Sequence, residues 1–392
     1  MASTCFRNAR VITPTGVYPG EVLVEGGVIT RVCFGKSIDA SVDCVIDVGG
    51  RYLSPGFIDI HTHGAGNADF MDGTLDAIYQ ACRAHMEHGT TSIVPTTITS
   101  TKEPLLSFVD LFNQVDLNRE DMPNILGLHL EGPYFAYEQR GAQDPKHLRN
   151  PDPEEYEAVL GRTDRIIRWS FAVELEGADK FLRVLSEHGI ISSLAHSDAT
   201  CEQVFRAYES GISALTHFYS AMSGVRRINA YRVAGAIEAG YLLDGLFVEV
   251  IADGKHLPKE LLRLIYKVKG AERICLVTDS MRAAGMPDGH YILGNKQTGM
   301  DTIVEDGVAK LTDRSAFAGS VSTTDRLVRT ILQMTDAPMH EAVKMMSLTP
   351  AKLLRVDNRK GSISEGKDAD LLVFDENIDV SLVMVGGRVL KG

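Results

Sequence analysis

Two histidines at the end of a strand-like run are the first candidates for chemistry in this sequence. His61 and His63 close the run FIDIHTHG at residues 57–64. Alternate side chains of a β-strand lie on one face, so both imidazoles point the same way. Such a pair can begin a metal site, but it also occurs as ordinary polar contacts at a strand end. Two ligands are fewer than the usual three or four, so further ligands at other strand ends would decide the matter.

Four further residues of metal-binding type each follow or end another short apolar run. They are Glu131 in GLHLE, His196 in SLAHS, His217 in LTHF and Asp279 in ICLVTDS. Imidazole and carboxylate ligands without cysteine suit Zn²⁺, with Fe²⁺, Co²⁺ and Mn²⁺ as other possibilities. A catalytic metal lowers the pKa of bound water to about 7, and Asp279 is then the natural general base. We predict metal-assisted hydrolysis at a carbonyl or related carbon; a buried structural role is the alternative for Asp279.

The remaining histidines are expected to have other roles. His129 lies two residues before Glu131 on the same face, where it would support a ligand or fill the interior. The others fall in predicted helices, loops or helix starts, where a solvated role is expected. They are His85, His88, His188, His147, His290 and His340.

The middle of the chain, residues 53–357, repeats a strand, a loop and a helix. Strand-like runs end near His63, Thr97, Glu131, Glu174, His196, His217, Asp253 and Asp279, and helical patterns follow at 75–88, 178–188, 200–210 and 259–268. Eight such units predict a (β/α)₈ TIM-type barrel, whose active site lies at the carboxyl ends of its strands. An open doubly wound sheet is the alternative, but no GxGxxG follows the first strand.

The two ends of the chain have a different residue pattern from the middle. Residues 1–52 and 358–392 read as short strands separated by Gly-Gly turns. Two or three strands are marginal in water by themselves, so we predict one small β domain built from both ends.

Composition excludes several classes of protein. The chain has 392 residues, of which 44% are hydrophobic and 23% charged, and its formal net charge is −12. This charge argues against nucleic acid as a partner, and the absence of a run of about 18 apolar residues argues against a membrane span. The first ten residues lack a signal-peptide layout and the six cysteines are scattered without CxxC. We therefore predict a reduced, cytoplasmic protein.

One compact basic group stands out in this acidic sequence. Arg226, Arg227 and Arg232 lie in a loop that leaves a predicted active-site strand. A dianionic phosphate would need such a group, although a solvated basic loop is the simpler alternative.

The motifs HTHG, HLEGP followed by Gly141-Ala142, AHS, THFYSAM, ADGKHLP, VTDSMRAAG and FAGS together resemble the N-acetylglucosamine-6-phosphate deacetylase family of the amidohydrolase superfamily. The likeness covers nearly the whole chain. It implies a barrel with a β-sandwich made of the terminal segments and a homodimer. It also implies removal of acetate from an N-acetylated amino sugar 6-phosphate.

The resemblance also implies roles for single residues. Glu131, His196 and His217 match the principal metal ligands, and Asp279 matches the catalytic aspartate. His61 and His63 match members that can hold a second metal, so one or two ions remain possible.

On the substrate side, the resemblance implies that backbone amides of Ser220 and Ala221 and an arginine shortly afterwards, Arg226 or Arg227, bind the phosphate. It also implies that His256 reaches in from a partner subunit.

Two departures bear on the substrate. The family commonly has KGAH where this chain has Arg140, Gly141, Ala142 and Gln143, and glutamine cannot carry charge. The phosphate loop also differs, with RRINAYR in place of the common HREPG. N-acetylgalactosamine 6-phosphate or an unphosphorylated sugar therefore remains an alternative substrate.

Rival classes explain less of the sequence. A cyclic-amidase-like member would have a bridging lysine at the end of strand 4, and residues 171–175 (FAVEL) contain none. A deaminase shares the paired histidines, His196 and Asp279, but gives no reason for Glu131 or the arginines. A metal-free sugar-phosphate scaffold would be expected to lose one of these ligands.

Overall fold

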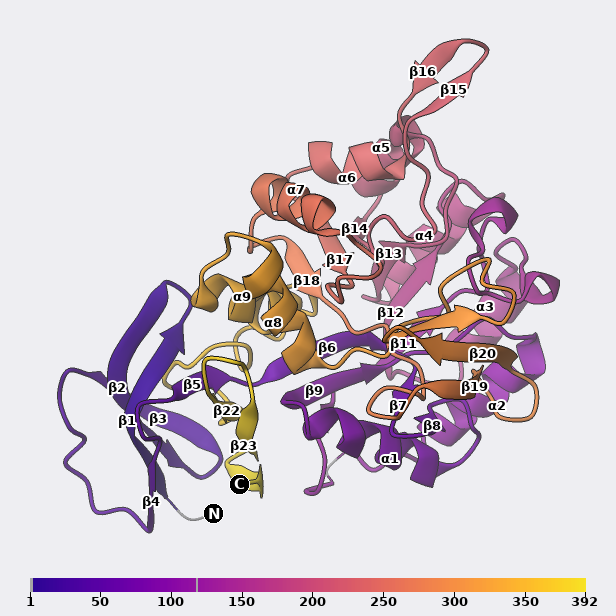
Figure 1. Cartoon of the computed structure of the whole chain (residues 1–392). Helices are drawn as coiled ribbons and strands as arrows, with labels where there is room; N and C mark the ends of the chain where they lie inside the picture. The colour runs from indigo at the N-terminus through magenta and orange to yellow at the C-terminus, as the bar shows by residue number, and fades with distance from the viewer. Residues whose placement is uncertain (1–2, 118) are drawn as a thin grey trace.

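Eight parallel strands form the centre of the computed structural model, which describes residues 3–117 and 119–392 (Figure 1). They are β6 (Phe57–Thr62), β9 (Thr90–Pro95), β11 (Leu128–Glu131), β12 (Ile166–Phe171), β13 (Ile191–Leu194), β14 (Ile212–Leu215), β17 (Phe247–Val250) and β18 (Ile274–Leu276). β6 pairs with β9, and β11 to β18 pair in chain order. A bridge between Thr96 and His129 joins the two sheets. The Asp279 amide donates to the His61 carbonyl (2.9 Å), which closes the ring. The predicted TIM-type core is confirmed.

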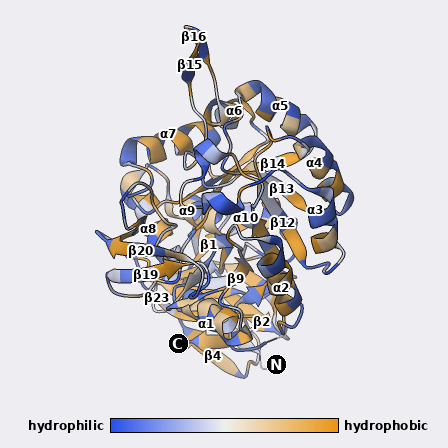
Figure 2. Cartoon of the chain, turned by 90° about the vertical axis from the view of Figure 1, so that its right-hand side faces the viewer, coloured by the Kyte–Doolittle hydropathy of each residue, from blue (hydrophilic) through white to orange (hydrophobic). Residues whose placement is uncertain are grey.

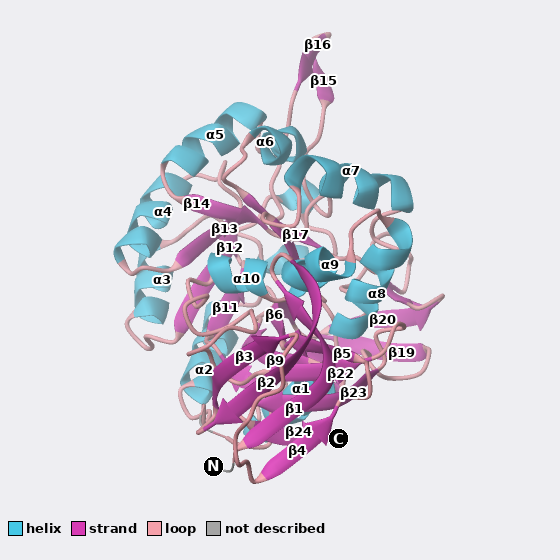
Figure 3. Cartoon of the chain, turned by 90° about the vertical axis from the view of Figure 1, so that its left-hand side faces the viewer, coloured by secondary structure: helices cyan, strands magenta, loops and turns pink. Residues whose placement is uncertain are grey.

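A helix follows each barrel strand and covers it from outside (Figure 3). The helices are α1 (Leu75–Met86), α2 (Lys102–Phe112), α3 (Pro153–Leu160), α4 (Ala178–Glu187), α5 (Cys201–Glu209), α6 (Ala236–Leu242), α7 (Lys259–Lys269) and α8 (Thr324–Met334). Capping residues fix where several of these helices begin. The Thr74 hydroxyl accepts from the Ala77 amide at the start of α1, and Thr200 and Gln203 form a capping box before α5.

Apolar packing fills the amino-terminal half of the barrel interior. Ile58, Ile60, Ile191 and Val277 cluster there, together with side chains of α10 (Leu348–Leu353). α9 (Met339–Met346) precedes α10 and packs against β18. Figure 2 shows hydrophobic colours on the central strands and mixed colours on the outer helices. The polar residues of the barrel are therefore left to gather at its other end.

Strands from both ends of the chain pair in a single sheet (Figures 1 and 3). They are β1 (Thr4–Thr13), β2 (Gly16–Glu25), β3 (Val28–Phe34), β4 (Cys44–Asp47), β5 (Tyr52–Pro55), β22 (Leu371–Phe374), β23 (Val380–Val385) and β24 (Arg388–Lys391). β5 joins the two sets by pairing Leu53 with Val373. Phe6, Val11 and Met384 belong to the separate core of this sheet.

Several short elements extend from the barrel. β15 (Arg226–Ile228) and β16 (Tyr231–Val233) form a hairpin that projects away from the body (Figure 1). β19 (Gly289–Leu293), β20 (Met300–Glu305) and β21 (Val308–Leu311) form a small sheet between β18 and α8. β7 (Gly64–Ala65) pairs with β8 (Ala68–Asp69), and β10 (Asn124–Ile125) pairs with β9. Among the described residues, no helix is long and apolar enough to cross a bilayer.

Candidate active site

All six candidate residues meet at the carboxyl ends of the barrel strands. His61 lies in β6, Glu131 ends β11, and the others follow their strands within three residues. Every one of the six is at most 8% exposed. Their ligand atoms form two groups, Glu131 with His196 and His217, and His61 with His63 and Asp279. The structure therefore brings together side chains that are far apart in the sequence.

The two histidines of the first group converge on one oxygen of the Glu131 carboxylate. The Nε2 atoms of His196 and His217 lie 3.4 and 3.2 Å from Glu131 Oε1 and 3.2 Å from each other. The Nδ1 atom of His196 donates to the Gln139 carbonyl (2.8 Å), and that of His217 donates to the Ser220 carbonyl (3.1 Å). Each ring therefore keeps its proton on Nδ1 and presents the Nε2 lone pair to the centre.

This arrangement fits a cation. Two nitrogen lone pairs and a carboxylate oxygen within 3.4 Å of one another repel unless a positive charge lies among them. Two imidazoles and a carboxylate are also a common protein ligand set of a catalytic zinc ion.

The second group lies across the same centre. His63 Nε2 is 3.2 Å from Asp279 Oδ1, and His61 Nε2 is 3.5 Å from both Asp279 Oδ1 and Glu131 Oε1. His61 Nε2 is buried and has no hydrogen-bond partner in the structure. An unpaired buried acceptor directed at two carboxylates is a further position that a metal could occupy.

Glu249 and Arg168 support this site, and the sequence reasoning missed both. Glu249 Oε2 accepts from His61 Nδ1 (3.1 Å), while Arg168 forms a fully buried ion pair with Glu249. Arg168 also donates to Ser193 Oγ and Thr216 Oγ1, both at 3.0 Å. The signal in the sequence was a single charged residue among mostly apolar neighbours, Arg168 in β12 and Glu249 in β17.

The charges of the site are strongly coupled to their surroundings. Burial by itself raises the pKa of Asp279, but His61 and His63 outweigh it and hold that pKa below its usual value. Burial likewise opposes ionisation of Glu131, yet hydrogen bonds from His196 and His217, formed when a proton occupies the place on Nε2 that a cation would take, keep the pKa of Glu131 well below normal. Both carboxylates are therefore anionic at neutral pH, as metal binding and proton abstraction require.

Three site residues have left-handed backbone conformations. The φ angles of His196, His217 and Asp279 are 45°, 34° and 44°. Such values are uncommon for residues with a Cβ and cluster at functional sites. They turn each side chain towards the centre directly after its strand ends.

A cavity of 210 Å³ opens onto the two groups. The predicted residues that line it are His63, Glu131, Gly141, Ala142, Gln143, His196, His217, Ser220, Ala221, His256 and Asp279. Ile98, Leu293, Ala316, Phe317 and Gly319 complete the lining. The cavity is thus the place where a substrate would meet the ligands.

Gln143 is held in place by two hydrogen bonds. Its amide nitrogen donates to Glu131 Oε2 (2.9 Å), and its carbonyl accepts from the Thr99 amide (3.1 Å). In this position Gln143 orients the Glu131 carboxylate as well as lining the cavity.

The phosphate-side expectations are altered by the structure. Arg226 is paired with Asp198, to which it also donates at the backbone carbonyl (3.1 Å), so its charge is already matched. Arg227 and Arg232 face each other across the projecting hairpin, and neither lines the cavity of its own chain. The Ser220 amide already donates to the His217 carbonyl (2.8 Å). His256 lines the cavity of its own chain.

Two other histidines have defined positions. His129 is fully buried and bonds to Thr96 Oγ1 (3.2 Å) and Ser170 Oγ (2.7 Å), which agrees with its expected interior role. The solvated role expected for His85 is wrong. It lies in α1 but is buried, contacts Thr62 Oγ1 (2.9 Å), and its pKa is lowered by burial to about 4. Placing His85 in a helix from the sequence therefore did not show that its side of α1 packs against the barrel.

Fold and site together define an amidohydrolase, and the family comparison agrees. A model described as the amidohydrolase family matches residues 52–390. The chain is 33% identical to the N-acetylglucosamine-6-phosphate deacetylase of Lysinibacillus sphaericus, covering 99% of this chain and 97% of that protein. It is 32% identical to the N-acetylgalactosamine-6-phosphate deacetylase of Escherichia coli O157:H7, covering 98% of each.

A solved structure is similar over its whole length. A variant of N-acetyl-D-glucosamine-6-phosphate deacetylase from Mycobacterium smegmatis, in complex with N-acetyl-D-glucosamine-6-phosphate, has a TM-score of 0.91 at 30% identity, covering 100% of both chains. The chain belongs to the N-acetylglucosamine-6-phosphate deacetylase family of the amidohydrolases. The resemblance found in the motifs is confirmed.

Proposed function

We propose that this protein is a metal-dependent hydrolase that removes acetate from N-acetylglucosamine 6-phosphate. The observation that carries the proposal is the convergence of Glu131, His196 and His217 opposite Asp279 at one cavity. Similarity over the full length to deacetylases of acetylated amino sugar phosphates supports it.

The metal is proposed to be Zn²⁺, held by Glu131, His196 and His217, with Fe²⁺, Co²⁺ and Mn²⁺ as alternatives. His61 and His63 with Asp279 could hold a second ion, so one or two per subunit are consistent with the two groups. A bound ion would polarise the acetyl oxygen and lower the pKa of water to about 7.

Asp279 performs the proton transfers in this proposal. Its ionised carboxylate takes a proton from water as the water oxygen bonds to the acetyl carbon. The carboxylate then delivers that proton to the sugar nitrogen as the C–N bond breaks, leaving acetate and a free amine. His63, 3.2 Å from Asp279 Oδ1, fixes the orientation of the carboxylate.

Gly141, Ala142 and Gln143 form one wall for the sugar, and Ser220, Ala221 and His256 form the wall proposed for its phosphate. His256 is oriented by Asp253, whose Oδ2 accepts from His256 Nδ1 (2.8 Å). An imidazole anchored in this way can direct its other nitrogen at an anion.

A homodimer is proposed to complete the phosphate site. The hairpin of β15 and β16 carries Arg227 and Arg232 away from the cavity of its own chain, and it exposes Val225, Ile228 and Tyr231. An exposed apolar projection of this kind suits a protein contact. A second copy in contact with it could receive Arg227 near its cavity.

Two wider expectations remain proposals. We infer that the single terminal sheet curls so that its two halves pack face to face, which makes residues 1–52 and 358–392 a β-sandwich domain beside a barrel of residues 53–357. The cytoplasm is the proposed location, because the six cysteines are unpaired in the structure.

N-acetylgalactosamine 6-phosphate is the second candidate substrate, because a relative 32% identical is named for that activity. Acetate release should be measured on N-acetylglucosamine and N-acetylgalactosamine, each with and without the 6-phosphate. The proposal predicts the highest kcat/KM for N-acetylglucosamine 6-phosphate. A preference for an unphosphorylated sugar would contradict it.

A further inference from the structure

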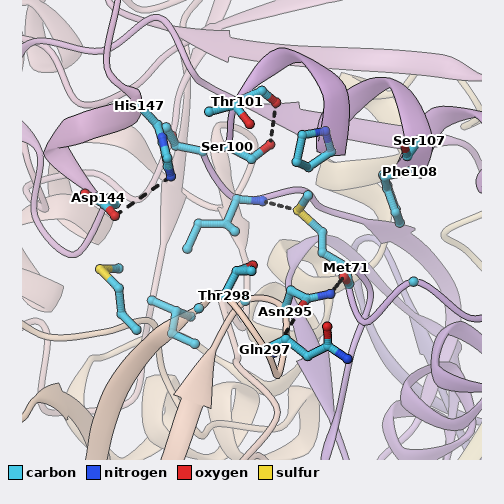
Figure 4. A pocket seen from close by; sticks show the side chains of 18 of the residues that line it. Met71, Ser100, Thr101, Ser107, Phe108, Asp144, His147, Asn295, Gln297 and Thr298 are labelled. Atoms are coloured by element: carbon cyan, nitrogen blue, oxygen red, sulfur yellow. Dashed lines mark hydrogen bonds and ion pairs between the residues drawn. The ribbon is translucent and has the colours of Figure 1, made fainter.

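A second and larger cavity lies beside the active-site cavity. It has a volume of 510 Å³ and lies between the loop after β9, the start of α2 and the turn from β19 to β20. Figure 4 shows Met71, Phe108 and Thr298 around it. Nothing in the proposed acetyl hydrolysis uses this space.

The lining of the second cavity suits an apolar ligand. Met71, Pro104, Phe108, Leu111 and Met300 contribute carbon and sulfur surface. Among its described lining residues there is no lysine or arginine to attract an anion. Asp144 and His147 face each other, with His147 Nε2 3.8 Å from Asp144 Oδ2 (Figure 4). An alkyl group that enters this cavity would move from water to apolar surface, and it would not bury an unpaired lysine or arginine.

Ile98 and Leu293 separate the two cavities and line both. Leu293 is 3% exposed and forms an apolar cluster against which Ile98, Ala142 and Met300 pack. Beside Ile98, the Thr99 amide bonds to Gln143, which in turn bonds to Glu131. The shared wall is therefore apolar and lies next to the metal-ligand carboxylate.

The chemistry of the substrate indicates which part meets this wall. If the proposed deacetylation is correct, the acyl carbon lies at the Glu131 and Asp279 carboxylates and the phosphate lies at the polar residues around His256. The acyl methyl group then has the apolar residues Ile98, Ala142 and Leu293 as its neighbours. Beyond Ile98 and Leu293 lies the 510 Å³ cavity.

We propose that Ile98 and Leu293 set the acyl chain length that this enzyme accepts, by closing the active site off from the second cavity. With the wall trimmed, the cavity holds the tail of a longer linear acyl group. The reaction is unchanged: water adds to the acyl carbon, the C–N bond breaks, and the products are a longer fatty acid and the same amino sugar phosphate. This proposal rests on the proposed function, whose substrate specificity it deepens.

The test is a series of N-acylglucosamine 6-phosphates with acetyl, butanoyl, hexanoyl and octanoyl groups. Wild-type protein should prefer acetyl. The hexanoyl-to-acetyl ratio of kcat/KM should rise at least about tenfold in Ile98→Ala, because each methylene moved into an apolar cavity is worth about fourfold. Leu293→Val, a smaller change, should shift the ratio in the same direction.

Thr298→Trp supplies the matched control. Thr298 is exposed, lines the second cavity and does not line the active-site cavity. Filling that space should leave acetyl turnover unchanged and should abolish the hexanoyl gain in an Ile98→Ala/Thr298→Trp double variant.

The outcomes separate the two proposals. If Ile98→Ala and Leu293→Val still release acetate but leave the hexanoyl-to-acetyl ratio unchanged, Ile98 and Leu293 do not set the accepted acyl chain length. A hexanoyl gain that persists with Thr298→Trp overturns the second cavity as the acyl site. A wild-type protein that releases no acid from any of the four substrates overturns the deacylase function itself.

Discussion

Glu249 accepts a hydrogen bond from His61 Nδ1 at 3.1 Å inside the barrel. Arg168 pairs with the same carboxylate, and burial, which raises the pKa of Glu249, is outweighed by Arg168 and His61. Glu249 is thus an ionised anchor that holds the proton of His61 on Nδ1 and turns Nε2 towards Asp279 and Glu131. The site depends on this buried layer as well as on its six inward-facing side chains.

Removing the charge of Glu249 should therefore weaken metal binding. Glu249→Gln keeps the shape but can no longer fix the His61 tautomer, and it leaves Arg168 without a counter-charge. We expect a loss of about 10- to 100-fold in metal affinity or turnover, as is typical for groups that orient metal ligands. Titration of the apoprotein with Zn²⁺ measures metal affinity, and acetate release measures turnover. The surface variant Glu376→Gln is the control, and equal behaviour of both variants would exclude the anchoring role.

Removing the metal should stop catalysis and lower stability. Dialysis against a chelator is expected to abolish acetate release, and Zn²⁺ should restore it. A ligand at 100 times its Kd stabilises the folded state by about 2.7 kcal/mol, so Tm should rise with added Zn²⁺. In His217→Ala, which removes one of the three converging ligands, the rise in Tm should be much smaller. Full activity in protein shown by elemental analysis to be metal-free would contradict the assignment.

The hairpin of β15 and β16, which carries Arg227 and Arg232, is predicted to contribute to phosphate binding. Arg227→Ala should lower kcat/KM for N-acetylglucosamine 6-phosphate by about tenfold or more, since a charge-assisted hydrogen bond is worth about 1.5–3 kcal/mol. The slower turnover of the unphosphorylated sugar should not change. Arg273→Ala, in the turn directly before β18 and outside the cavity lining, is the matched control. Equal slowing of both sugars by Arg227→Ala would remove this residue from the phosphate site.

Much of the site could be predicted because barrel geometry turns sequence patterns into positions. A ligand-type residue at the end of a strand must lie near the others once the strands form a ring, so His61, Glu131, His196, His217 and Asp279 could be grouped in advance. The helices at 75–86 and 178–187 were visible from their helical residue pattern.

Other features depended on contacts that a sequence does not display. The burial of His85 depends on which face of α1 meets the barrel, and the pairing of Arg168 with Glu249 depends on two strands that are not neighbours in the chain. The pairing of Arg226 with Asp198 likewise depends on how the loop after β14 folds back. The left-handed backbone at His217 and the second cavity behind Ile98 also appear only in three dimensions.

The central claim is that Asp279 moves protons at a metal centre built from Glu131, His196 and His217. Asp279→Asn keeps the size of the side chain but cannot accept the proton of water. The most direct measurement is acetate release by this variant, with its metal content determined on the same sample. We predict that the Glu131–His196–His217 group still holds metal while turnover falls about 10²-fold or more. Turnover close to that of the wild type would contradict the account.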